Sequence, residues 1–328
     1  MRDRRPMAAP AKAEVGKARR RLAAAHHAAV VSHERPDGDA VGSALATALS
    51  LRLTGKQAEA VFPDGLPARY RFLPGAATVR RDLPAGIDLI ITVDCSTLDR
   101  LGPAGVAVPV VNIDHHPTNT LFGQINLVDA QASATAELLY NLAPGLGLPI
   151  DVDVATNLLA GIVTDTIGFR TASTTPRVLQ AAADLMTRGA ALSDVYERTL
   201  NQHSLSALRY WSHGLGRLEC EGGLVWCSLT LEDRRAAQYG GNDDADLINL
   251  LGTVDGARVA LILVEQADGR TKVSWRCREG FNVARLAEQF GGGGHDLAAG
   301  AMISGERAQV ELTVLSATRA TLEAVGPA

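Results

Sequence analysis

The sequence is poor in cysteine and in aromatic residues, and it has no long apolar run. Its four cysteines show no CxxC pairing, which excludes a disulfide framework and is typical of reduced thiols in a cytoplasmic protein. No apolar segment approaches the roughly 20 residues that a membrane helix needs, and the basic N-terminus lacks the apolar stretch of a signal peptide. We therefore expect a cytoplasmic protein with no membrane partner.

An excess of positive charge is also missing. The chain carries a net charge of −4, whereas proteins that bind long nucleic acids concentrate cationic side chains. This balance argues against a long duplex as partner and remains compatible with a small anionic substrate held by a few local cations or metal ions. The 328 residues, 46% of them hydrophobic, suffice for two domains of about 100–200 residues each.

The first half contains an alternation of apolar and helical segments. Apolar runs at residues 28–32, 58–62, 87–93 and 108–113 predict buried strands, and residues 40–53 predict a helix between the first two. Strands that alternate with helices are typical of βαβ units. The predicted fold class is α/β, with a mostly parallel sheet in the N-terminal domain.

The second half predicts helices and then a smaller α/β domain. Helices are expected at 133–142, 152–164 and 176–188, followed by strands at 224–230, 259–265 and 271–278, a helix at 282–290 and a closing helix at 306–325. We divide the chain into a disordered tail (1–13), a first domain (14–190), a helical linker (191–210) and a second domain (211–328).

Acidic residues and histidines follow the predicted strands of the first domain. His33, Asp37 and Asp39 come after the first strand, Asp94 after the third and Asp114 after the fourth. Because ligands bind beyond the carboxyl ends of parallel strands, we expect these side chains to meet at one edge of the sheet. Taken alone, Asp39 also fits a helix N-cap, and Asp94 fits a cap or turn residue better than a ligand.

Two further features extend this cluster. His115 and His116 follow Asp114 directly, and adjacent side chains of an extended segment face opposite ways, so we expect at most one of them to bind a given ion. Asp165 ends the apolar helix at 152–164, where a carboxylate opposes the helix dipole by up to about 1 kcal/mol. A bound metal ion would offset that penalty.

Carboxylates and imidazoles without a thiolate favour manganese, with magnesium, cobalt or iron as alternatives. The donors suffice for two ions that share one carboxylate. Two such ions about 3.5–4 Å apart are the usual arrangement for in-line attack on phosphorus.

The second domain offers two candidate anion-binding features. The segment 291–295, Gly-Gly-Gly-Gly-His, fits either a flexible linker or a nest of backbone N–H groups around a phosphate. Ser274, Arg276 and Arg278 share one face of a predicted strand, and Arg276 is the better candidate for binding a phosphate or carboxylate. For Arg278, a solvated strand edge is an equally good interpretation.

In this order, the motifs resemble those of the DHH phosphoesterase superfamily, and the two-domain layout resembles its NrnA-like nanoRNase branch. The matching segments are His33–Ser43, Asp94, Asp114–Pro117, Gly161–Thr166 and, in the DHH-associated domain, residues 271–300. One departure is Cys277, where relatives often have serine beside the phosphate-binding arginine. The resemblance implies an active site in the cleft between a DHH catalytic domain and a smaller DHH-associated domain.

The resemblance also implies a role for each matching residue. The implied metal ligands are His33 and Asp37 for one manganese ion, Asp39, His115 and Asp165 for a second, and Asp94 as the bridge between them. His116 would contact the scissile phosphate, and Asp114 would orient the two histidines. The implied substrate-binding residues are Arg276, Gly292, Gly293, Gly294 and His295.

The implied activity is manganese-dependent hydrolysis of very short oligoribonucleotides, including linear dinucleotides such as pApA, to 5′-mononucleotides. A 3′-phosphatase activity on 3′-phosphoadenosine 5′-phosphate (pAp) accompanies it, and a hydroxide held by two metal ions would attack phosphorus. The expected partners are short single-stranded RNA or DNA and pAp, with a homodimer as the expected assembly. Two alternatives stay open: a RecJ-like exonuclease for single strands, and a catalytically silent nucleotide-binding regulator.

Overall fold

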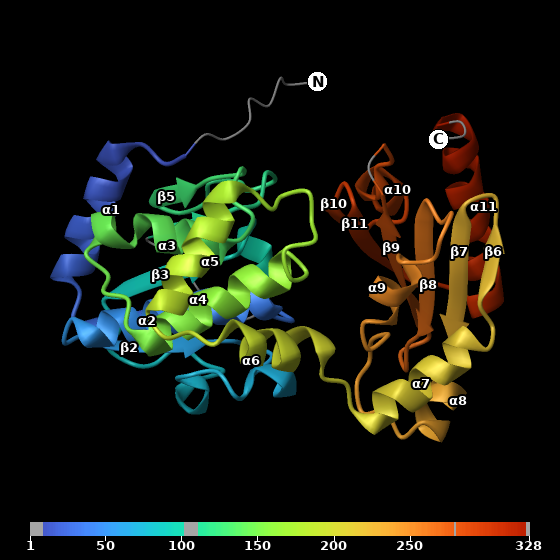
Figure 1. Ribbon diagram of the computed structural model, residues 1–328, viewed down its shortest axis with the longest axis horizontal. Coiled ribbons are helices and arrows are strands. Elements are labelled where there is room, and N and C mark those ends of the chain that lie inside the picture. The colour runs from blue at the N-terminus through green and yellow to red at the C-terminus, as the bar shows by residue number, and fades with distance from the viewer. Residues whose placement is uncertain (1–8, 102–110, 279, 326–328) are drawn as a thin grey trace. The chain divides into compact units, whose positions relative to one another are not determined.

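The structure, a computed structural model, describes residues 9–101, 111–278 and 280–325. They divide into two compact units, one ending at Gln202 and the other beginning at His203 (Figure 1). Residues 108–110 of the fourth predicted strand and residues 1–8 of the predicted tail lie outside the described residues. Among the residues described, no helix has the length and apolar composition needed to cross a membrane.

The first unit is built on a five-stranded sheet whose strands all run parallel, in the order β2-β1-β3-β4-β5. Its strands are β1 (His27–Val31), β2 (Gln57–Val61), β3 (Leu89–Val93), β4 (Val111–Asp114) and β5 (Ile125–Val128). The structure thus confirms the predicted parallel sheet. Strand β5 was not predicted, because an asparagine interrupts its four-residue run and no long apolar pattern marks it.

Helices α2 and α3 pack on the strands of this sheet, and α4 packs against α2 and α3 (Figure 1). The helical elements are α1 (Lys12–Ala24), α2 (Gly38–Leu53), α3 (Thr135–Leu146), α4 (Val152–Asp165), α5 (Pro176–Thr187), α6 (Leu192–Tyr196), the single-turn η1 (Ala68–Tyr70), η2 (Ala76–Thr78) and η3 (Leu98–Leu101), and the π-helical η4 (Glu197–Asn201). Strand β1 alternates accordingly. Ala28 and Val30 face the large helical core, whereas Ala29 and Val31 face a small cluster that includes Cys95.

Two glycines let α2 and α4 approach at backbone distance. A Cβ atom on Gly42 would collide with the carbonyl oxygen of Asn157, and one on Gly161 would lie 2.7 Å from Asp39 Oδ1. A larger residue at either position would therefore force the helices apart. This close packing brings the start of α2, with Asp39, next to the end of α4, with Asp165.

The second unit is built on a six-stranded mixed sheet in the order β10-β11-β9-β8-β7-β6. Its strands are β6 (Glu219–Glu221), β7 (Leu224–Leu229), β8 (Val259–Glu265), β9 (Arg270–Cys277), β10 (Gly293–His295) and β11 (Ala298–Ser304), and its helices are α7 (Leu205–Leu215), α8 (Leu231–Ala236), α9 (Leu247–Leu251), α10 (Val283–Glu288) and α11 (Arg307–Val325). Only β7 and β8 run parallel to each other. The structure confirms the predicted smaller α/β unit and its β8–β9 hairpin.

Both faces of this second sheet are covered by helices. On one face, Val273 and Trp275 of β9 belong to a core shared with α10 and α11; on the other face lies a core shared with α7, α8 and α9. The polar residues of β9, Ser274 and Arg276, therefore do not line an open edge. Strand β9 lies between β8 and β11 and is therefore not an edge strand of the sheet.

Candidate metal centre

Seven of the predicted site residues come together at the carboxyl edge of the parallel sheet. They form three groups of potential ligands whose donor atoms lie within 4.8 Å of one another: Asp94, His115 and His116; His33, Asp37 and Asp94; Asp39, His115 and Asp165. The two groups with Asp94 meet at its carboxylate, and the two with His115 meet at its imidazole. The cluster is therefore one connected arrangement with room for more than one cation. Its members also include His116, which was assigned a substrate contact.

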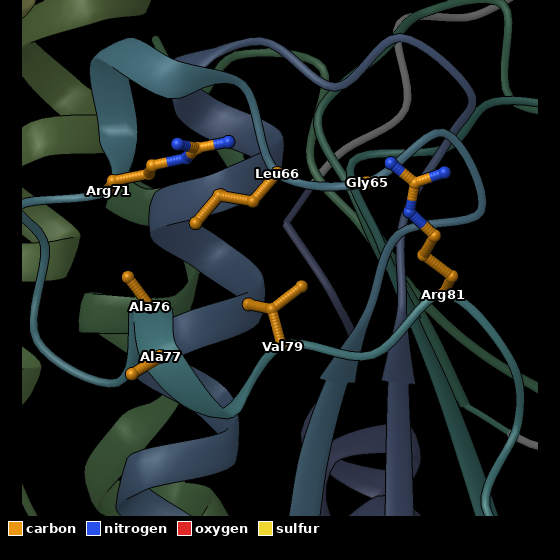
Figure 2. A pocket seen from close by; sticks show the side chains of 7 residues that line it. All are labelled: Gly65, Leu66, Arg71, Ala76, Ala77, Val79 and Arg81. Carbon is orange, nitrogen blue, oxygen red and sulfur yellow. The ribbon is translucent and has the colours of Figure 1, made fainter.

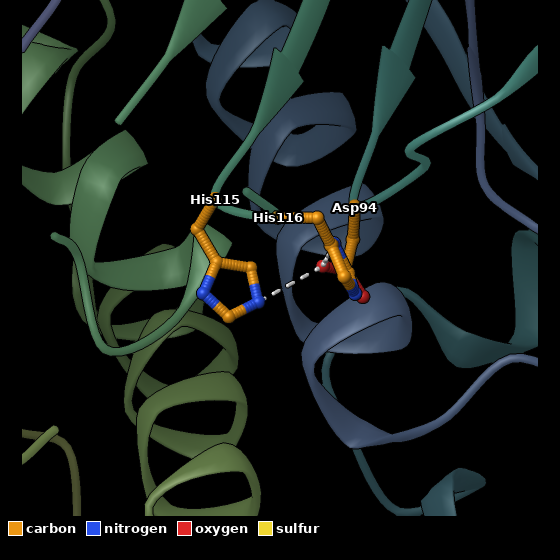
Figure 3. A group of neighbouring side chains, drawn as sticks. All are labelled: Asp94, His115 and His116. Atoms are coloured by element: carbon orange, nitrogen blue, oxygen red, sulfur yellow. Dashed lines mark ion pairs between the residues drawn. The ribbon is translucent and has the colours of Figure 1, made fainter. Parts of the chain in front are cut away.

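Asp94 lies at the centre of this arrangement. It directly follows β3 in a left-handed conformation, with φ of 55°, that aspartate tolerates better than most residues. Its Oδ2 is 3.6 Å from His33 Nε2, whereas its Oδ1 is 3.7 Å from both His115 Nε2 and His116 Nδ1; Figure 3 shows both imidazoles beside the carboxylate. The two oxygens of one buried carboxylate thus face the two halves of the cluster.

These separations are too long for ordinary hydrogen bonds. His115 Nε2 also lies 3.4 Å from Asp165 Oδ2. Donor atoms that each lie about 2.1 Å from one octahedral ion are separated by roughly 3–4 Å, so the spacing suits cation ligands better than direct contacts.

The histidine pair departs from the sequence-based expectation. Strand β4 ends at Asp114, and neither of the next two residues belongs to a strand, so the alternation of a strand does not apply to them. The rings of His115 and His116 lie 4.7 Å apart between centroids, at an angle of 65°, and both approach the same oxygen of Asp94. The expectation that they face opposite ways is wrong.

Asp114 is completely buried and connects the two histidines. Its Oδ1 accepts hydrogen bonds from His116 Nδ1 at 2.7 Å and from the backbone N–H of His115 at 2.9 Å, while its Oδ2 accepts one from Asn119 Nδ2 at 2.5 Å. This is the geometry required of an orienting acid. Nothing in the local sequence singles out Asn119, which is reached only through the fold.

The residue that caps the N-terminus of α2 is Asp37 and not Asp39. The N-cap of α2 is Asp37, whose carboxylate accepts a hydrogen bond from Ala40 N, whereas Asp39 lies within the first turn. The N-cap interpretation of Asp39 is therefore wrong. Its carboxylate is buried and accepts hydrogen bonds from Ser43 Oγ and from two backbone N–H groups at the start of α3.

The electrostatics of the cluster favour a cation. Burial, together with the charges of Asp94 and Asp165, raises the pKa of Asp39 well above its usual value. Burial and the charges of Asp37 and Asp94 raise the pKa of Asp165 in the same way. Crowded carboxylates of this kind repel one another, and a divalent cation would relieve that repulsion.

The histidines only partly compensate this negative charge. Burial lowers the pKa of His33, His115 and His116, but the carboxylates of Asp94 and its neighbours outweigh burial, so that the pKa of each is raised. In turn, the three imidazoles overcome the burial of Asp94 and lower its pKa.

The chemistry of the donors fits a hard or borderline divalent cation. All donors in the three groups are carboxylate oxygens or imidazole nitrogens. Cys95, the nearest cysteine in sequence, is buried in an apolar cluster, directs its Sγ to the carbonyl of Thr97 and has its pKa raised by burial to about 12. A protonated thiol in that position does not serve as a ligand.

The substrate-binding residues predicted for the second unit lie on neighbouring strands. Arg276 on β9 pairs in register with Ala298 on β11, which in turn pairs with His295 on β10. The segment predicted as a linker or nest thus partly forms β10, a strand that was not predicted. The side chain of His295 lies outside what the structure describes.

Packing explains only part of the glycine run. A Cβ atom on Gly292 would collide with the carbonyl oxygen of Gly300, and one on Gly294 would collide with that of Ala298. A Cβ atom on Gly293, by contrast, would meet no atom within 4 Å. The space beside the Cα atom of Gly293 is therefore open, and packing against the described residues does not require glycine at this position.

A separate hollow on the first unit contains none of the predicted site residues. It is lined by Gly65, Leu66, Arg71, Ala76, Ala77, Val79 and Arg81. Figure 2 shows the guanidinium groups of Arg71 and Arg81 directed toward the Gly65–Leu66 segment from opposite sides. Exposed arginines are common on solvated surfaces, so we assign this hollow no function.

Two family models match the chain. Residues 27–162 match the N-terminal domain of the DHH family, and residues 236–320 match the DHHA1 domain. The chain belongs to the DHH family and is a phosphoesterase.

Among its relatives, the chain is similar to proteins named bifunctional oligoribonuclease and PAP phosphatase NrnA. The protein of that name from Thermus thermophilus is 36% identical over 302 residues, which cover 90% of each chain. The one from Bacillus subtilis is 29% identical over 285 residues, covering 83% of this chain and 87% of the relative.

Solved structures share the fold. An exopolyphosphatase-related protein from Bacteroides fragilis gives a TM-score of 0.89 at 24% identity, covering 97% of this chain and 98% of that one. RecJ from Thermus thermophilus, solved in complex with Mn²⁺, gives a TM-score of 0.53 at 14% identity and covers 98% of this chain and 56% of that one.

Proposed function

We propose that this phosphoesterase degrades very short oligoribonucleotides, including linear dinucleotides such as pApA, to 5′-mononucleotides. We also propose that it removes the 3′-phosphate of pAp and that both activities depend on Mn²⁺. The observation that carries the proposal is the buried cluster around Asp94, with donors on both sides of one carboxylate. It occurs in a chain whose relatives are named oligoribonucleases and PAP phosphatases.

The residues present fit two divalent ions. His33 and Asp37 would hold one and Asp39, His115 and Asp165 the other, with Asp94 shared between them. Two divalent ions supply charge stabilisation for in-line attack on phosphorus. Mixed oxygen and nitrogen donors favour Mn²⁺, with Mg²⁺ or Co²⁺ as substitutes.

The chain itself would orient the substrate through His116. Asp114 accepts a hydrogen bond from His116 Nδ1 at 2.7 Å, which fixes the ring and keeps a proton on that nitrogen. Nε2 is then the nitrogen that we assign to the scissile phosphate. Because Asp114 is itself held by Asn119, the imidazole would be preorganised for this contact rather than recruited by the substrate.

Arg276 and the glycine segment would bind the remaining phosphate and sugar groups of the substrate. The guanidinium of Arg276 is half-buried, and its only hydrogen bond within the described part of the chain goes to the carbonyl of Trp275. A half-buried guanidinium retains most of its donors for an anion. The open backbone at Gly293 is suited to close approach by a ligand.

Substrate length is the test that separates this proposal from its alternatives. We expect the protein with Mn²⁺ to hydrolyse RNA of two to about five nucleotides and pAp efficiently, and to act poorly on long single strands. The assay is a series of 5′-labelled RNAs, from a dinucleotide to a long oligonucleotide, with pAp in parallel. Efficient digestion of the long strand that leaves dinucleotides intact would indicate a RecJ-like exonuclease, and no hydrolysis of any substrate would indicate a silent regulator.

Replacing Arg276 by alanine should raise KM for a dinucleotide about 10- to 100-fold, because a hydrogen-bonded charged contact contributes about 1.5–3 kcal/mol. The kcat should change little, since Arg276 belongs to the second unit and not to the cluster. Arg270→Ala is the matched control: Arg270 begins the same strand, is exposed and pairs with Asp268. Equal KM values for the two variants would remove Arg276 from the substrate site.

A cytoplasmic location is also proposed. It is supported by the four cysteines, all of which are free thiols in the structure, as is typical of a reducing compartment.

A further inference from the structure

The first turn of α3 contacts two carboxylates of the candidate metal centre, those of Asp39 and Asp94. The N-cap of α3, Ala134, has no capping side chain. Instead, the backbone N–H groups of Thr135 and Ala136 donate to Asp39 Oδ2 at 2.6 Å and Oδ1 at 3.0 Å. A carboxylate from a distant segment therefore takes the place of the cap, and the N-terminus of α3 holds it in one orientation.

The same turn also contacts the central carboxylate. The hydroxyl of Thr135, which is completely buried, donates to Asp94 Oδ1 at 2.9 Å. This oxygen faces His115 and His116, whereas Oδ2 faces His33. The hydrogen bond therefore sets the rotation of the Asp94 carboxylate, which decides whether each oxygen points to its own half of the cluster.

An ion pair between the buried Glu137 and the partly exposed Arg177 anchors the turn itself. Glu137, with no exposed surface, accepts hydrogen bonds from the backbone N–H of Ser133 at 2.6 Å and from its hydroxyl at 2.8 Å. The other oxygen of Glu137 accepts from Arg177 Nε at 2.6 Å, and Arg177 also lies 3.5 Å from Asp129. The turn is thus anchored to α5 by groups that do not touch the cluster.

We propose that Thr135 is a positioning residue of the metal centre, which holds Asp94 in the orientation that serves both ions, and that Glu137 keeps Thr135 in place. The inference rests on the proposed metal centre and extends it to residues outside the donor set. Groups that orient metal ligands typically change metal affinity about 10- to 100-fold when they are removed. Local sequence gives no sign of this role, because Thr135 lies 41 residues after Asp94.

The test is Mn²⁺ binding to the full chain, measured by titration calorimetry after removal of metal. Thr135→Val preserves the shape of the side chain and removes only the hydroxyl donor. We expect its Mn²⁺ affinity to fall about 10- to 100-fold, and Thr135→Ser, which restores the donor, to bind nearly as the unaltered chain does. Thr199→Val is the matched control, because Thr199 is buried and its hydroxyl contacts only the carbonyl of Val195.

Unaltered affinity in Thr135→Val would overturn the positioning role while leaving the metal centre intact. Equal losses in Thr135→Val and Thr199→Val would overturn it as well, since they would indicate general destabilisation. If the unaltered chain itself binds no Mn²⁺, the metal centre and this inference fail together, which is a distinct result.

A second variant keeps the test valid if Thr135→Val does not fold. Glu137→Gln retains an acceptor for Ser133 but removes the charge that faces Arg177. We expect this variant to bind Mn²⁺ several-fold more weakly. Because Glu137 contacts none of the potential metal ligands, such a loss would have to result from a shift of the turn that carries Thr135. A folded Glu137→Gln protein with unaltered Mn²⁺ affinity would overturn the role of Glu137.

Discussion

Replacing Asp94 by asparagine should lower kcat on a dinucleotide by about 1,000-fold or more and should leave the protein without tightly bound Mn²⁺. The two oxygens of the Asp94 carboxylate face different parts of the cluster, at 3.6 Å from His33 and 3.7 Å from His115. Charge stabilisation by bound ions contributes several kcal/mol to such a reaction, and about 1.4 kcal/mol corresponds to a tenfold change in rate. Losing the shared ligand would remove most of that contribution.

Asparagine is the informative substitution because it keeps the size and shape of the side chain but removes the charge and one of the two oxygens. It tolerates the left-handed backbone of residue 94, and its side-chain oxygen can still accept the hydrogen bond from Thr135. Asp82→Asn, at an exposed position of the same unit, is the matched control and should retain full activity. Metal content by elemental analysis and kcat by product release provide the two readouts. An Asp94→Asn protein that is active and fully loaded with metal would contradict the bridging role.

The convergence of the site followed from simple rules of the fold. His33, Asp94 and Asp114 each come at or just after the end of a predicted strand, and parallel strands end at one edge. The structure has these strands and brings the three residues to that edge. The apolar pattern of the strands therefore predicted the edge of the sheet where the site lies. It did not predict which atoms of the site face each other.

Predictions from short stretches of sequence failed for residues whose contacts come from distant segments of the chain. Asp94 alone looked like a cap or turn residue, because its importance comes from His33 and His115, which lie on other strands or loops. Thr135 had no signal for the same reason. The period-two rule failed for the histidine pair because it applies to strands, and β4 ends at Asp114, before both histidines.

The metal-free protein should lose stability as the pH rises through the neutral range. The pKa values of His33, His115 and His116 are raised by the surrounding carboxylates. A histidine with a raised pKa stabilises the fold fully below its unfolded value of about 6.5, and this contribution disappears as the pH rises through the folded pKa.

The carboxylates of the cluster do not reverse this trend. Burial and neighbouring charges raise the pKa of Asp39 and Asp165, so their contribution is present below the unfolded value of about 3.9 and is lost as the pH rises through their folded pKa. The pKa of Asp94 is lowered. Its contribution is therefore present above about pH 4 and is lost only in more acidic solution.

Bound Mn²⁺ should reverse this loss, and its stabilising effect should grow with pH because ions and protons compete for the same ligands. At a free concentration about 100 times Kd, a ligand adds about 2.7 kcal/mol, or about 5–10 °C in Tm for a unit of this size. The measurement is Tm with excess Mn²⁺ and with a chelator at pH 6, 7 and 8. We expect the difference between the two Tm values to widen from pH 6 to pH 8 and to be small at every pH in Asp94→Asn. A difference that is constant or narrows over this range would show that protons and Mn²⁺ do not share the cluster, and the assignment of His33 and His115 as ligands would have to be abandoned.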